Sequence, residues 1–462
     1  MEQSPVEALR LQLGPDHVLT DQASRDTYGR DWTKHYDINA SGVAFPESID
    51  DVVKIVTWAR ANKIALVPSG GRTGLSGGAC ATKGELVVSF EKMNKVLELN
   101  KIDRTVRVQP GLVTEALQQY AEEQGFYYPV DFAAVGSSQI GGNIATNAGG
   151  IKVLRYGLTR DWIAGLKVVT GAGELLEVGG DLVKNATGLD LRHLFIGSEG
   201  TLGFVVEATI KLAQPPKPLS VLMLAVPDLD SIMKVFGAFR TSVPLTAFEY
   251  FSDIALRVVQ AHTHLPSPLT SSSPNYLIIE VENLDDSVQE RMLATFESCV
   301  EQGWATDGAI AQSDAQARDF WRLREDISEA TASFQPYKND VSVTISKVPE
   351  FLKEVDAILK TQYPDFEVVW FGHIGDGNMH INILKPESLT REKFLERCLK
   401  VNELLFTVIH KLGGSISAEH GVGLVKKPFL TFSRSPAEIA LMKGIKKVFD
   451  PDLIMNPGKV FD

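Results

Sequence analysis

The chain has 462 residues, of which 44% are hydrophobic and 23% are charged, and its formal net charge is −12 at pH 7. This length exceeds what one hydrophobic core usually serves, so two or three domains are expected. The acidic balance argues against a general nucleic-acid binder, which needs a basic face for phosphates, and no apolar run approaches the roughly 20 residues of a membrane helix.

The N-terminus and the cysteines point to an ordinary cytoplasmic protein. Acidic side chains stand among residues 1–7, where a signal or transit peptide needs basic ones. Cys80, Cys299 and Cys398 have no paired spacing, so neither a disulfide framework nor a cysteine zinc site is indicated.

The first half of the chain predicts short alternating helices and strands around two glycine-rich segments. After a leading helix at 6–14, a helix that begins near Pro46 carries a buried stripe. Strands are expected at 64–67, 85–90, 96–99, 105–108, 162–169 and 175–178, and a helix at 113–124.

The first glycine-rich segment, residues 68–78, has five glycines between positions 70 and 78. The chain has no G-x-G-x-x-G after a strand, and this loop lacks the Gly-Lys-Ser/Thr ending of a P-loop. What remains is a loop whose backbone N–H groups can hold a pyrophosphate, with a flexible surface loop as the alternative.

The second segment, residues 136–150, has almost no bulky side chain, but it places Ile140 and Ile144 four residues apart. A linker would be equally small without that spacing. We therefore expect its backbone to lie against a flat ligand, with Ser137, Thr146 and Asn147 available for hydrogen bonds.

Three prolines within residues 214–218 mark a domain boundary. Beyond it, strands at 221–226, 246–251 and 276–281 alternate with helices at 229–240, 252–261 and 286–302, and a final helix is expected at 436–449. This alternation predicts an α+β domain whose sheet carries helices on one side and leaves the other face open.

Two histidines flank a turn in residues 371–382, and the strand that follows places His380 and Asn382 on one face. The turn can bring His373 beside them, and Glu419 offers a third, acidic ligand for a divalent metal. Two histidines beside a turn are also common as hydrogen-bonded loop residues, so the pair alone leaves both interpretations open.

Residues 68–78, 141–150 and 197–203, in that order, resemble the FAD-binding domain of the vanillyl-alcohol-oxidase-type (PCMH-type) flavoproteins. The resemblance implies that the first two segments hold the pyrophosphate and isoalloxazine of FAD. Residues 68–78 contain no histidine for covalent attachment, so non-covalent FAD is expected. The cofactor-binding residues expected from this resemblance are Pro68, Ser69, Gly70, Gly71, Arg72, Thr73, Gly74, Leu75, Gly136, Ser137, Ile140, Gly141, Gly142, Asn143, Thr146, Asn147, Gly149, Val205 and Asn456.

Residues 372–380, 417–423 and 456–459 are similar to the D-2-hydroxyacid dehydrogenase branch of that superfamily. The similarity implies a divalent metal, usually zinc, on His373, His380 and Glu419, with His420 and Asn382 close to the substrate. Oxidation of the alcohol needs the hydroxyl proton removed while hydride leaves C2 for flavin N5. A cation favours the first step, and His420 is the expected catalytic base, because histidine ordinarily titrates near neutral pH.

The same resemblance implies that Arg324, Ser328 and Lys338 grip the distal carboxylate of D-2-hydroxyglutarate. Arg324 and Ser328 are four apart on an expected helix and so share a face. A solvated helix face and a charged loop are the alternative. D-lactate or glycolate would need fewer cations and is the second expectation for the substrate.

The fold expected from these features is α+β: a two-subdomain PCMH-type FAD-binding domain, then a substrate domain with a mainly antiparallel sheet and a helical C-terminal segment. The predicted boundaries are 1–40 for an N-terminal segment, 41–213 for the FAD-binding domain, 219–418 for the substrate domain, and 419–462 for a segment that packs back on the FAD domain. No nicotinamide site is found, so the expected electron acceptor is an electron-transfer flavoprotein or a quinone-linked carrier.

Three alternatives stay open from the sequence. They are a D-lactate or glycolate dehydrogenase, an alkyl-transfer flavoenzyme, and a non-catalytic flavin-binding subunit. The oligomeric state, for which a homodimer is one option, is also left open.

Overall fold

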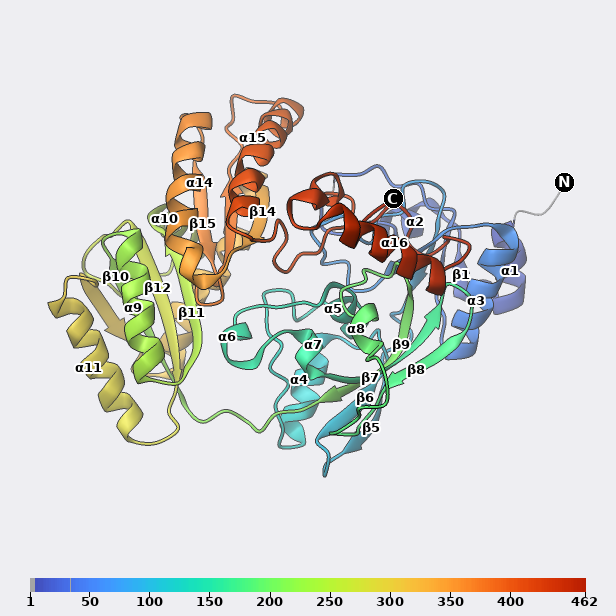
Figure 1. Ribbon diagram of the computed structural model, residues 1–462, viewed down its shortest axis with the longest axis horizontal. Coiled ribbons are helices and arrows are strands. Elements are labelled where there is room, and N and C mark those ends of the chain that lie inside the picture. The colour runs from blue at the N-terminus through green and yellow to red at the C-terminus, as the bar shows by residue number, and fades with distance from the viewer. Residues whose placement is uncertain (1–4, 34) are drawn as a thin grey trace. The chain divides into compact units, whose positions relative to one another are not determined.

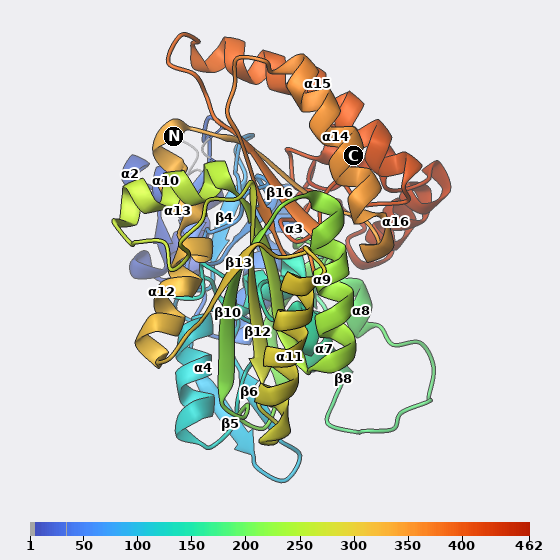
Figure 2. The ribbon, with the colours of Figure 1, turned by 90° about the vertical axis from the view of Figure 1, so that its left-hand side faces the viewer.

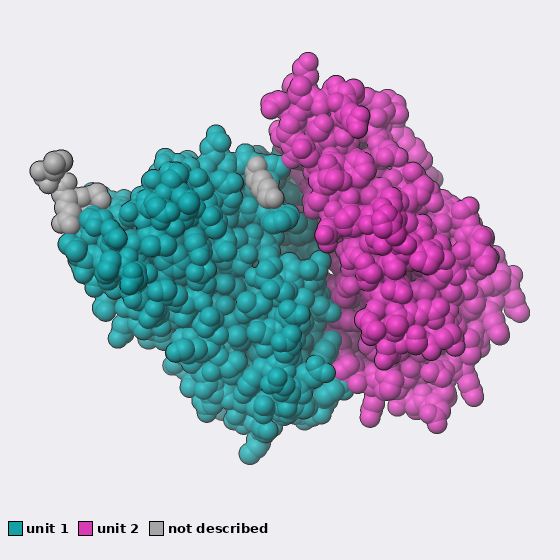
Figure 3. All heavy atoms as spheres, turned by 180° about the vertical axis from the view of Figure 1, so that it is seen from behind, with its two compact units in different colours: residues 1–149, 158–215, 419–462 teal, residues 150–157, 216–418 magenta. Residues whose placement is uncertain are grey.

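The computed structural model describes residues 5–33 and 35–462. The chain folds into two compact units, shown in two colours in Figure 3. Unit 1 contains the described residues of the ranges 1–149, 158–215 and 419–462, and unit 2 contains residues 150–157 and 216–418. In the part of the chain that the structure describes, no helix is long and apolar enough to span a membrane.

Unit 1 begins with a small sheet in the order β1-β2-β4-β3, in which β2, β4 and β3 are parallel. Its buried strands pack against α3, whose first turn is closed by a capping box between Ser48 and Asp51. The elements are α1 (Pro5–Leu13), a 3₁₀ turn (Pro15–His17), β1 (Val18–Leu19), α2 (Gln22–Tyr28), β2 (Gly42–Ala44), α3 (Ile49–Asn62), β3 (Leu66–Ser69) and β4 (Leu86–Ser89).

The second sheet of unit 1 is antiparallel, in the order β5-β6-β9-β7-β8, and its buried face packs against α4 and α5 (Figure 1). The C-terminal helix α16 joins the same core, where the rings of Phe449 and Phe195 lie 5.0 Å apart. The elements are β5 (Val96–Asn100), β6 (Thr105–Val108), α4 (Thr114–Glu123), α5 (Ile140–Thr146), α7 (Thr159–Trp162), β7 (Ile163–Thr170), β8 (Leu175–Gly179), α8 (Arg192–Phe195), β9 (Gly203–Lys211), a 3₁₀ segment (Lys427–Phe432) and α16 (Pro436–Phe449).

Unit 2 is built on one antiparallel sheet in the order β13-β10-β12-β11-β15-β16-β14. Its strands are β10 (Leu219–Val226), β11 (Leu245–Ser252), β12 (Asn275–Glu282), β13 (Asp307–Ile310), β14 (Tyr337–Ser342), β15 (Val368–Gly372) and β16 (Asn378–Ile383). The expected α+β class is therefore confirmed, and Lys338 lies within β14 rather than before it.

Helices cover both faces of this sheet, so the expectation of helices on one side only is wrong. On one face α9 places Phe236 against Phe248 with ring centroids 4.9 Å apart, while α10, α12 and α13 cover the opposite face with the core around Phe251 and Phe371. In Figure 2, α9 and α11 run alongside each other. The reason is in the strands: every residue of β12 is buried, so neither face can be left to water. The helices are α6 (Val153–Tyr156), α9 (Leu229–Ser242), α10 (Asp253–Thr263), α11 (Ser287–Glu301), α12 (Asp314–Glu325), α13 (Ile327–Ala330), α14 (Val348–Gln362) and α15 (Arg391–Lys411).

Candidate functional site

The two glycine-rich segments of unit 1 lie backbone against backbone. Strand β3 ends at Ser69, and the loop that follows brings Gly71 so close to residue 137 that a Cβ on Gly71 would lie 2.1 Å from the Ser137 carbonyl oxygen. No side chain fits there, so glycine at position 71 is needed for the close approach of the two segments.

The second segment contains the short helix α5, and its side chains divide into two sets. Ile140 and Ile144 are fully buried in the core, and Asn143 donates to Thr114 Oγ1 at 2.6 Å. Any contact that Ile140 or Asn143 makes with a cofactor would therefore use the backbone. Gly142 is different, because a Cβ there would meet no atom of residues 5–33 and 35–462 within 4 Å.

Several buried polar atoms near these segments have no hydrogen-bond partner among the described residues, and Gln139 Oε1 and Asn456 Oδ1 are two of them. Gln139 Oε1 is 3.6 Å from where a Cβ on Gly70 would stand. Asn456 Nδ2 donates to the carbonyl oxygens of Gly78 (2.9 Å) and Glu199 (2.7 Å). A buried acceptor without a donor is costly, so both atoms suit a polar ligand. Sequence reasoning missed Gln139, although it precedes α5 directly.

The segment after residue 419 is fixed on the first glycine loop within unit 1. Ser76 Oγ donates to the His420 carbonyl at 2.9 Å, and the Glu199 carboxylate accepts the N–H groups of Val422 (2.6 Å) and Gly423 (2.8 Å). Burial raises the pKa of Glu199 to about 7, although those two N–H groups act in the opposite direction.

Glu419 and His420 lie in an irregular bend, and His420 Nε2 is 3.7 Å from Glu419 Oε1. Adjacent side chains on a strand would point to opposite faces. The bend, followed by Gly421 at φ +80° and Gly423 at φ +50°, lets both side chains serve one place.

Unit 2 collects the other predicted residues on one face of its sheet. Across β14 and β16, Asp340 is opposite His380 and Lys338 is opposite Asn382. His373 begins the turn between β15 and β16, where Gly377 is required because a Cβ would lie 2.1 Å from the Val343 carbonyl oxygen.

Each of the two histidines has a carboxylate at its Nδ1 atom. His373 Nδ1 is 2.9 Å from Glu249, and His380 Nδ1 is 3.7 Å from Asp340 Oδ1. The two imidazole rings lie 5.4 Å apart between centroids. For His373 this is the arrangement in which metal-binding histidines coordinate through Nε2, whereas the distance from His380 to Asp340 is too long for a hydrogen bond. Two imidazoles with buried carboxylates beside them still form a donor set that fits a divalent metal. Sequence reasoning missed both Glu249 and Asp340, since neither stands near the histidines in the chain.

The predicted substrate cations differ in their surroundings. Arg324 is buried, with Nη2 2.8 Å from Glu249 Oε2 and its guanidinium 5.0 Å from the centre of the Phe371 ring. Lys338 is half-buried and has no ion pair or side-chain hydrogen bond among residues 5–33 and 35–462, and desolvation lowers its pKa. Ser328 lies in α13, whereas Arg324 lies in α12, and the turn at Asp326 separates the two helices. The expectation that one continuous helix carries both residues is therefore wrong. Asn382 Nδ2 donates to Thr331 Oγ1 at 3.3 Å.

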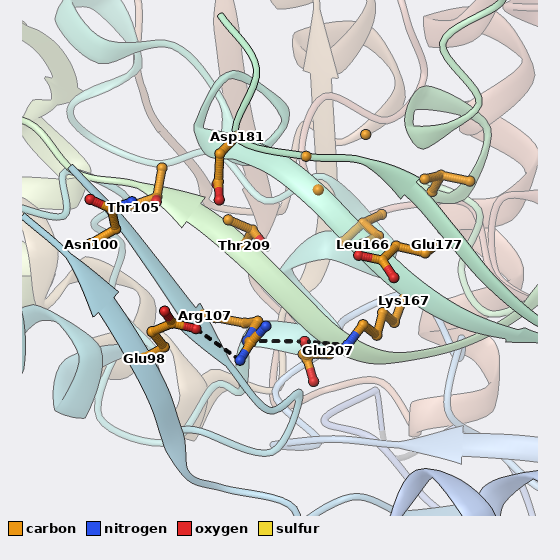
Figure 4. A pocket seen from close by; sticks show the side chains of 14 residues that line it. Glu98, Asn100, Thr105, Arg107, Leu166, Lys167, Glu177, Asp181, Glu207 and Thr209 are labelled. Carbon is orange, nitrogen blue, oxygen red and sulfur yellow. Dashed lines mark ion pairs between the residues drawn. The ribbon is translucent and has the colours of Figure 1, made fainter. Parts of the chain in front are cut away.

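A separate hollow on the polar face of the five-stranded sheet contains none of the predicted site residues (Figure 4). Arg107 pairs there with Glu98 (2.9 Å) and Glu207 (3.3 Å), and Lys167 pairs with Glu207 (3.0 Å). The opposite charges on this solvated sheet face form ion pairs with one another. The hollow is therefore not part of the chemistry of the glycine loops or of the histidines.

The sequence matches two family descriptions: "FAD binding domain" over residues 40–179 and "FAD linked oxidases, C-terminal domain" over residues 215–460. The chain belongs to the FAD-linked oxidase family. FAD is therefore its cofactor, and this FAD-linked oxidase is an oxidoreductase.

Relatives with assigned names agree with this membership. The FAD-linked oxidase is 58% identical to the D-2-hydroxyglutarate dehydrogenase of Stutzerimonas stutzeri (99% of this chain, 98% of the relative). It is 55% identical to that of Xanthomonas citri pv. viticola (100% and 96%) and 35% identical to the mitochondrial one of Arabidopsis thaliana (97% and 80%).

Solved structures share the fold at low identity. An alkyldihydroxyacetonephosphate synthase matches with a TM-score of 0.76 and 18% identity over 99% of this chain and 86% of that one. The 4-ethylphenol oxidase of Gulosibacter chungangensis also has a TM-score of 0.76, with 17% identity over 99% and 96%. The fold prediction is confirmed by these matches.

Proposed function

We propose that this FAD-linked oxidase oxidises a D-2-hydroxyacid to the 2-oxoacid, with D-2-hydroxyglutarate preferred. The observation that carries the proposal is the array on one sheet face of unit 2. It combines two imidazoles, of which His373 has a carboxylate 2.9 Å from Nδ1 and His380 has one at 3.7 Å, with the ammonium of Lys338. Lys338 lies opposite Asn382 and has no ionic partner among the described residues. The bacterial relatives named D-2-hydroxyglutarate dehydrogenase support the choice of substrate.

A divalent metal, with zinc preferred, would be held by His373, His380 and Glu419. Two neutral imidazoles and a carboxylate suit zinc and leave coordination positions open. Asp340 supports Glu419 as the third ligand, because its Oδ2 accepts the N–H of Ala418, the residue directly before Glu419, at 3.1 Å. A cation there would supply Lewis acidity toward the substrate hydroxyl. Asp340 itself is a further candidate ligand beside His380.

The protein side chains would divide the remaining work. Lys338 attracts the distal carboxylate and Arg324 and Ser328 orient it. Asn382 hydrogen-bonds the substrate near the reacting carbon, and His420 removes the hydroxyl proton. His420→Ala should lower kcat by about 10²- to 10⁴-fold, whereas near-normal turnover would remove it from the mechanism.

FAD supplies the hydride acceptor and is held without a covalent bond, since residues 68–78 contain no histidine. Denaturation with acid should release the flavin into the supernatant. An electron-transfer flavoprotein or a quinone-linked carrier would take the electrons onward. This choice of electron acceptor would be contradicted if oxygen reoxidised the reduced enzyme quickly and neither carrier reoxidised it.

The proposed function is tested by anaerobic mixing of the holoenzyme with a panel of D-2-hydroxyacids. We expect D-2-hydroxyglutarate to bleach the flavin absorbance fastest, ahead of D-lactate and glycolate. Fastest bleaching by D-lactate would instead identify a monocarboxylate dehydrogenase. No bleaching by any member would leave alkyl transfer or a non-catalytic flavin subunit as the function.

A further inference from the structure

Glu249 stands between two groups that the proposed function assigns to different tasks. Its carboxylate lies 2.9 Å from Nδ1 of His373 and 2.8 Å from Nη2 of Arg324. All three side chains belong to unit 2 and are buried. A single side chain therefore touches both the candidate metal ligand and the candidate substrate cation.

The strand register places Glu249 on the same sheet face as the rest of the array. In β11, Glu249 is two residues before Phe251, which pairs with Phe371 of β15, and Phe371 pairs with His380 of β16. Residues two apart on a strand, and residues paired across strands, point to one face. Helix α12 packs on that face and carries Arg324, so Glu249 lies beneath both groups.

The chemistry of the contact fixes which nitrogen of His373 can bind a metal. An ionised carboxylate only accepts hydrogen bonds, so at 2.9 Å from Glu249 the Nδ1 atom is the one that carries the proton. The lone pair is then on Nε2, which is the atom that would coordinate. The Asp340 carboxylate is less well placed to do this for His380. It lies 3.7 Å away and accepts hydrogen bonds from Asn378 (2.8 Å) and Ala418 (3.1 Å).

The ion pair with Arg324 has a second consequence. Glu249 compensates the charge of the buried guanidinium through an ion pair of 2.8 Å that does not have hydrogen-bond geometry. Arg324 Nε and Nη2 and Glu249 Oε2 have no hydrogen-bond partner among the described residues. A buried ion pair contributes little net stability, because desolvation offsets the attraction. Stability alone is therefore a weak reason for a charged pair at this place, whereas orientation of two functional groups is a sufficient one.

We infer that Glu249 is a positioning residue that holds His373 for metal binding and Arg324 for the substrate carboxylate, and so couples the two. This inference rests on the proposed function. Because the coupling passes through one carboxylate, a change at Arg324 should reach the metal only while Glu249 is present.

The test measures zinc affinity of the metal-free, FAD-loaded enzyme by competition with a chromogenic chelator. Glu249→Gln should weaken zinc binding about 10- to 100-fold, as is typical when the partner of a ligating histidine is lost. The matched control is Glu280→Gln. Glu280 is buried on the same face of the neighbouring strand, pairs with Lys152, and accepts from Trp321 Nε1 at 3.1 Å. The control should keep wild-type zinc affinity.

A double-mutant cycle tests the coupling. Arg324→Met should change the zinc Kd at least threefold in the wild-type background and leave it unchanged in the Glu249→Gln background. Zinc affinity of Glu249→Gln within twofold of wild type, or equal effects of Arg324→Met in both backgrounds, would overturn the inference. If Glu249→Gln does not fold, Glu249→Asp keeps the charge, withdraws the carboxylate by one methylene, and should still weaken zinc binding.

The zinc affinity of the wild type distinguishes a failure of the proposed function from a failure of the inference about Glu249. Absence of zinc binding in the wild type would show that the metal part of the proposed function is wrong, and the inference would fall with it. Wild-type zinc binding that is unchanged in Glu249→Gln would overturn only the role of Glu249.

Discussion

The surroundings of the Lys338 ammonium group favour a substrate with a second carboxylate. Buried cations are normally paired, yet this ammonium is half-buried, has a lowered pKa from desolvation, and has no ionic partner among the described residues. A substrate carboxylate would supply the missing charge. Arg324, which Glu249 already neutralises, would contribute direction rather than net charge.

Lys338→Met should therefore reduce kcat/KM for D-2-hydroxyglutarate about 10- to 100-fold. This is the loss expected when one hydrogen bond to a charged group is removed. D-lactate has no distal carboxylate, so its kcat/KM should change less than about threefold. Steady-state kinetics with both substrates checks this, with Lys347→Met as control, because Lys347 pairs with Glu350 on the surface. Equal losses for both substrates would dispose of the carboxylate clamp.

Glu199 gives a pH dependence of stability whose sign follows from its raised pKa. Desolvation, with a smaller effect from Asp31, lifts the pKa from 4.5 to about 7 in the folded state. Between these two values the folded protein binds more protons than the unfolded one. The protonated Glu199 carboxyl therefore contributes about 3 kcal/mol at most to the free energy of unfolding. This contribution is fully present below about pH 4.5 and is lost as the pH rises through 7.

Urea unfolding at several pH values checks this prediction. Between pH 4.5 and 7, the free energy of unfolding of Glu199→Gln minus that of the wild type should rise with pH, because the variant lacks the group whose stabilising protonation is lost over this interval. Glu123→Gln, which changes an exposed carboxylate of the same unit, should follow the wild type. Identical pH profiles for Glu199→Gln and the wild type would contradict the raised pKa.

At the scale of elements, α5 illustrates how a glycine-rich segment can be helical and still leave one side open. Its isoleucines enter the core, while a Cβ on Gly142 would meet no atom of the described residues within 4 Å. Gly71 has the opposite role, since it lets two backbone segments touch.

Gly142→Ala should leave the apoprotein at least as stable as the wild type, because alanine favours a helix by about 1 kcal/mol over glycine. It should weaken FAD binding about 10-fold or more, because a methyl group would enter the space proposed for the cofactor. Flavin fluorescence titration measures the Kd. The control is Gly237→Ala in α9, another helical glycine with open space around it. An unchanged Kd for Gly142→Ala would place the flavin elsewhere.

At the scale of the whole molecule, the expected cofactor-binding residues and the proposed metal ligands are different side chains. The glycine loops lie in unit 1 and His373 and His380 lie in unit 2, while the third proposed ligand, Glu419, is a residue of unit 1. Because no proposed ligand is among the expected cofactor-binding residues, removal of the metal should leave FAD bound.

Treatment with a chelator should abolish reduction of the flavin by D-2-hydroxyglutarate and leave FAD bound, and added zinc should restore reduction. Absorbance of the bound flavin after gel filtration, followed by anaerobic mixing with substrate, measures both. Full reduction in protein shown to be metal-free would refute the metal role.

Much of this molecule could be predicted locally. Periodicity and turn residues within short windows predict four features. These are the alternation of β10 and α9, the boundary prolines, the two glycine segments and the β15–β16 hairpin. The histidines were found in the same way, because His380 and Asn382 obey a two-residue repeat along one strand.

Only the tertiary structure decided which distant groups meet. Glu249 stands 124 residues before His373 in the chain, Asp340 is on another strand, and Gln139 had no distinguishing pattern, so no local periodicity could connect them with the site. The covering of both sheet faces was missed for the same reason. A sequence determines the direction in which a side chain points along its own strand, whereas the strand or helix that lies opposite is determined by packing.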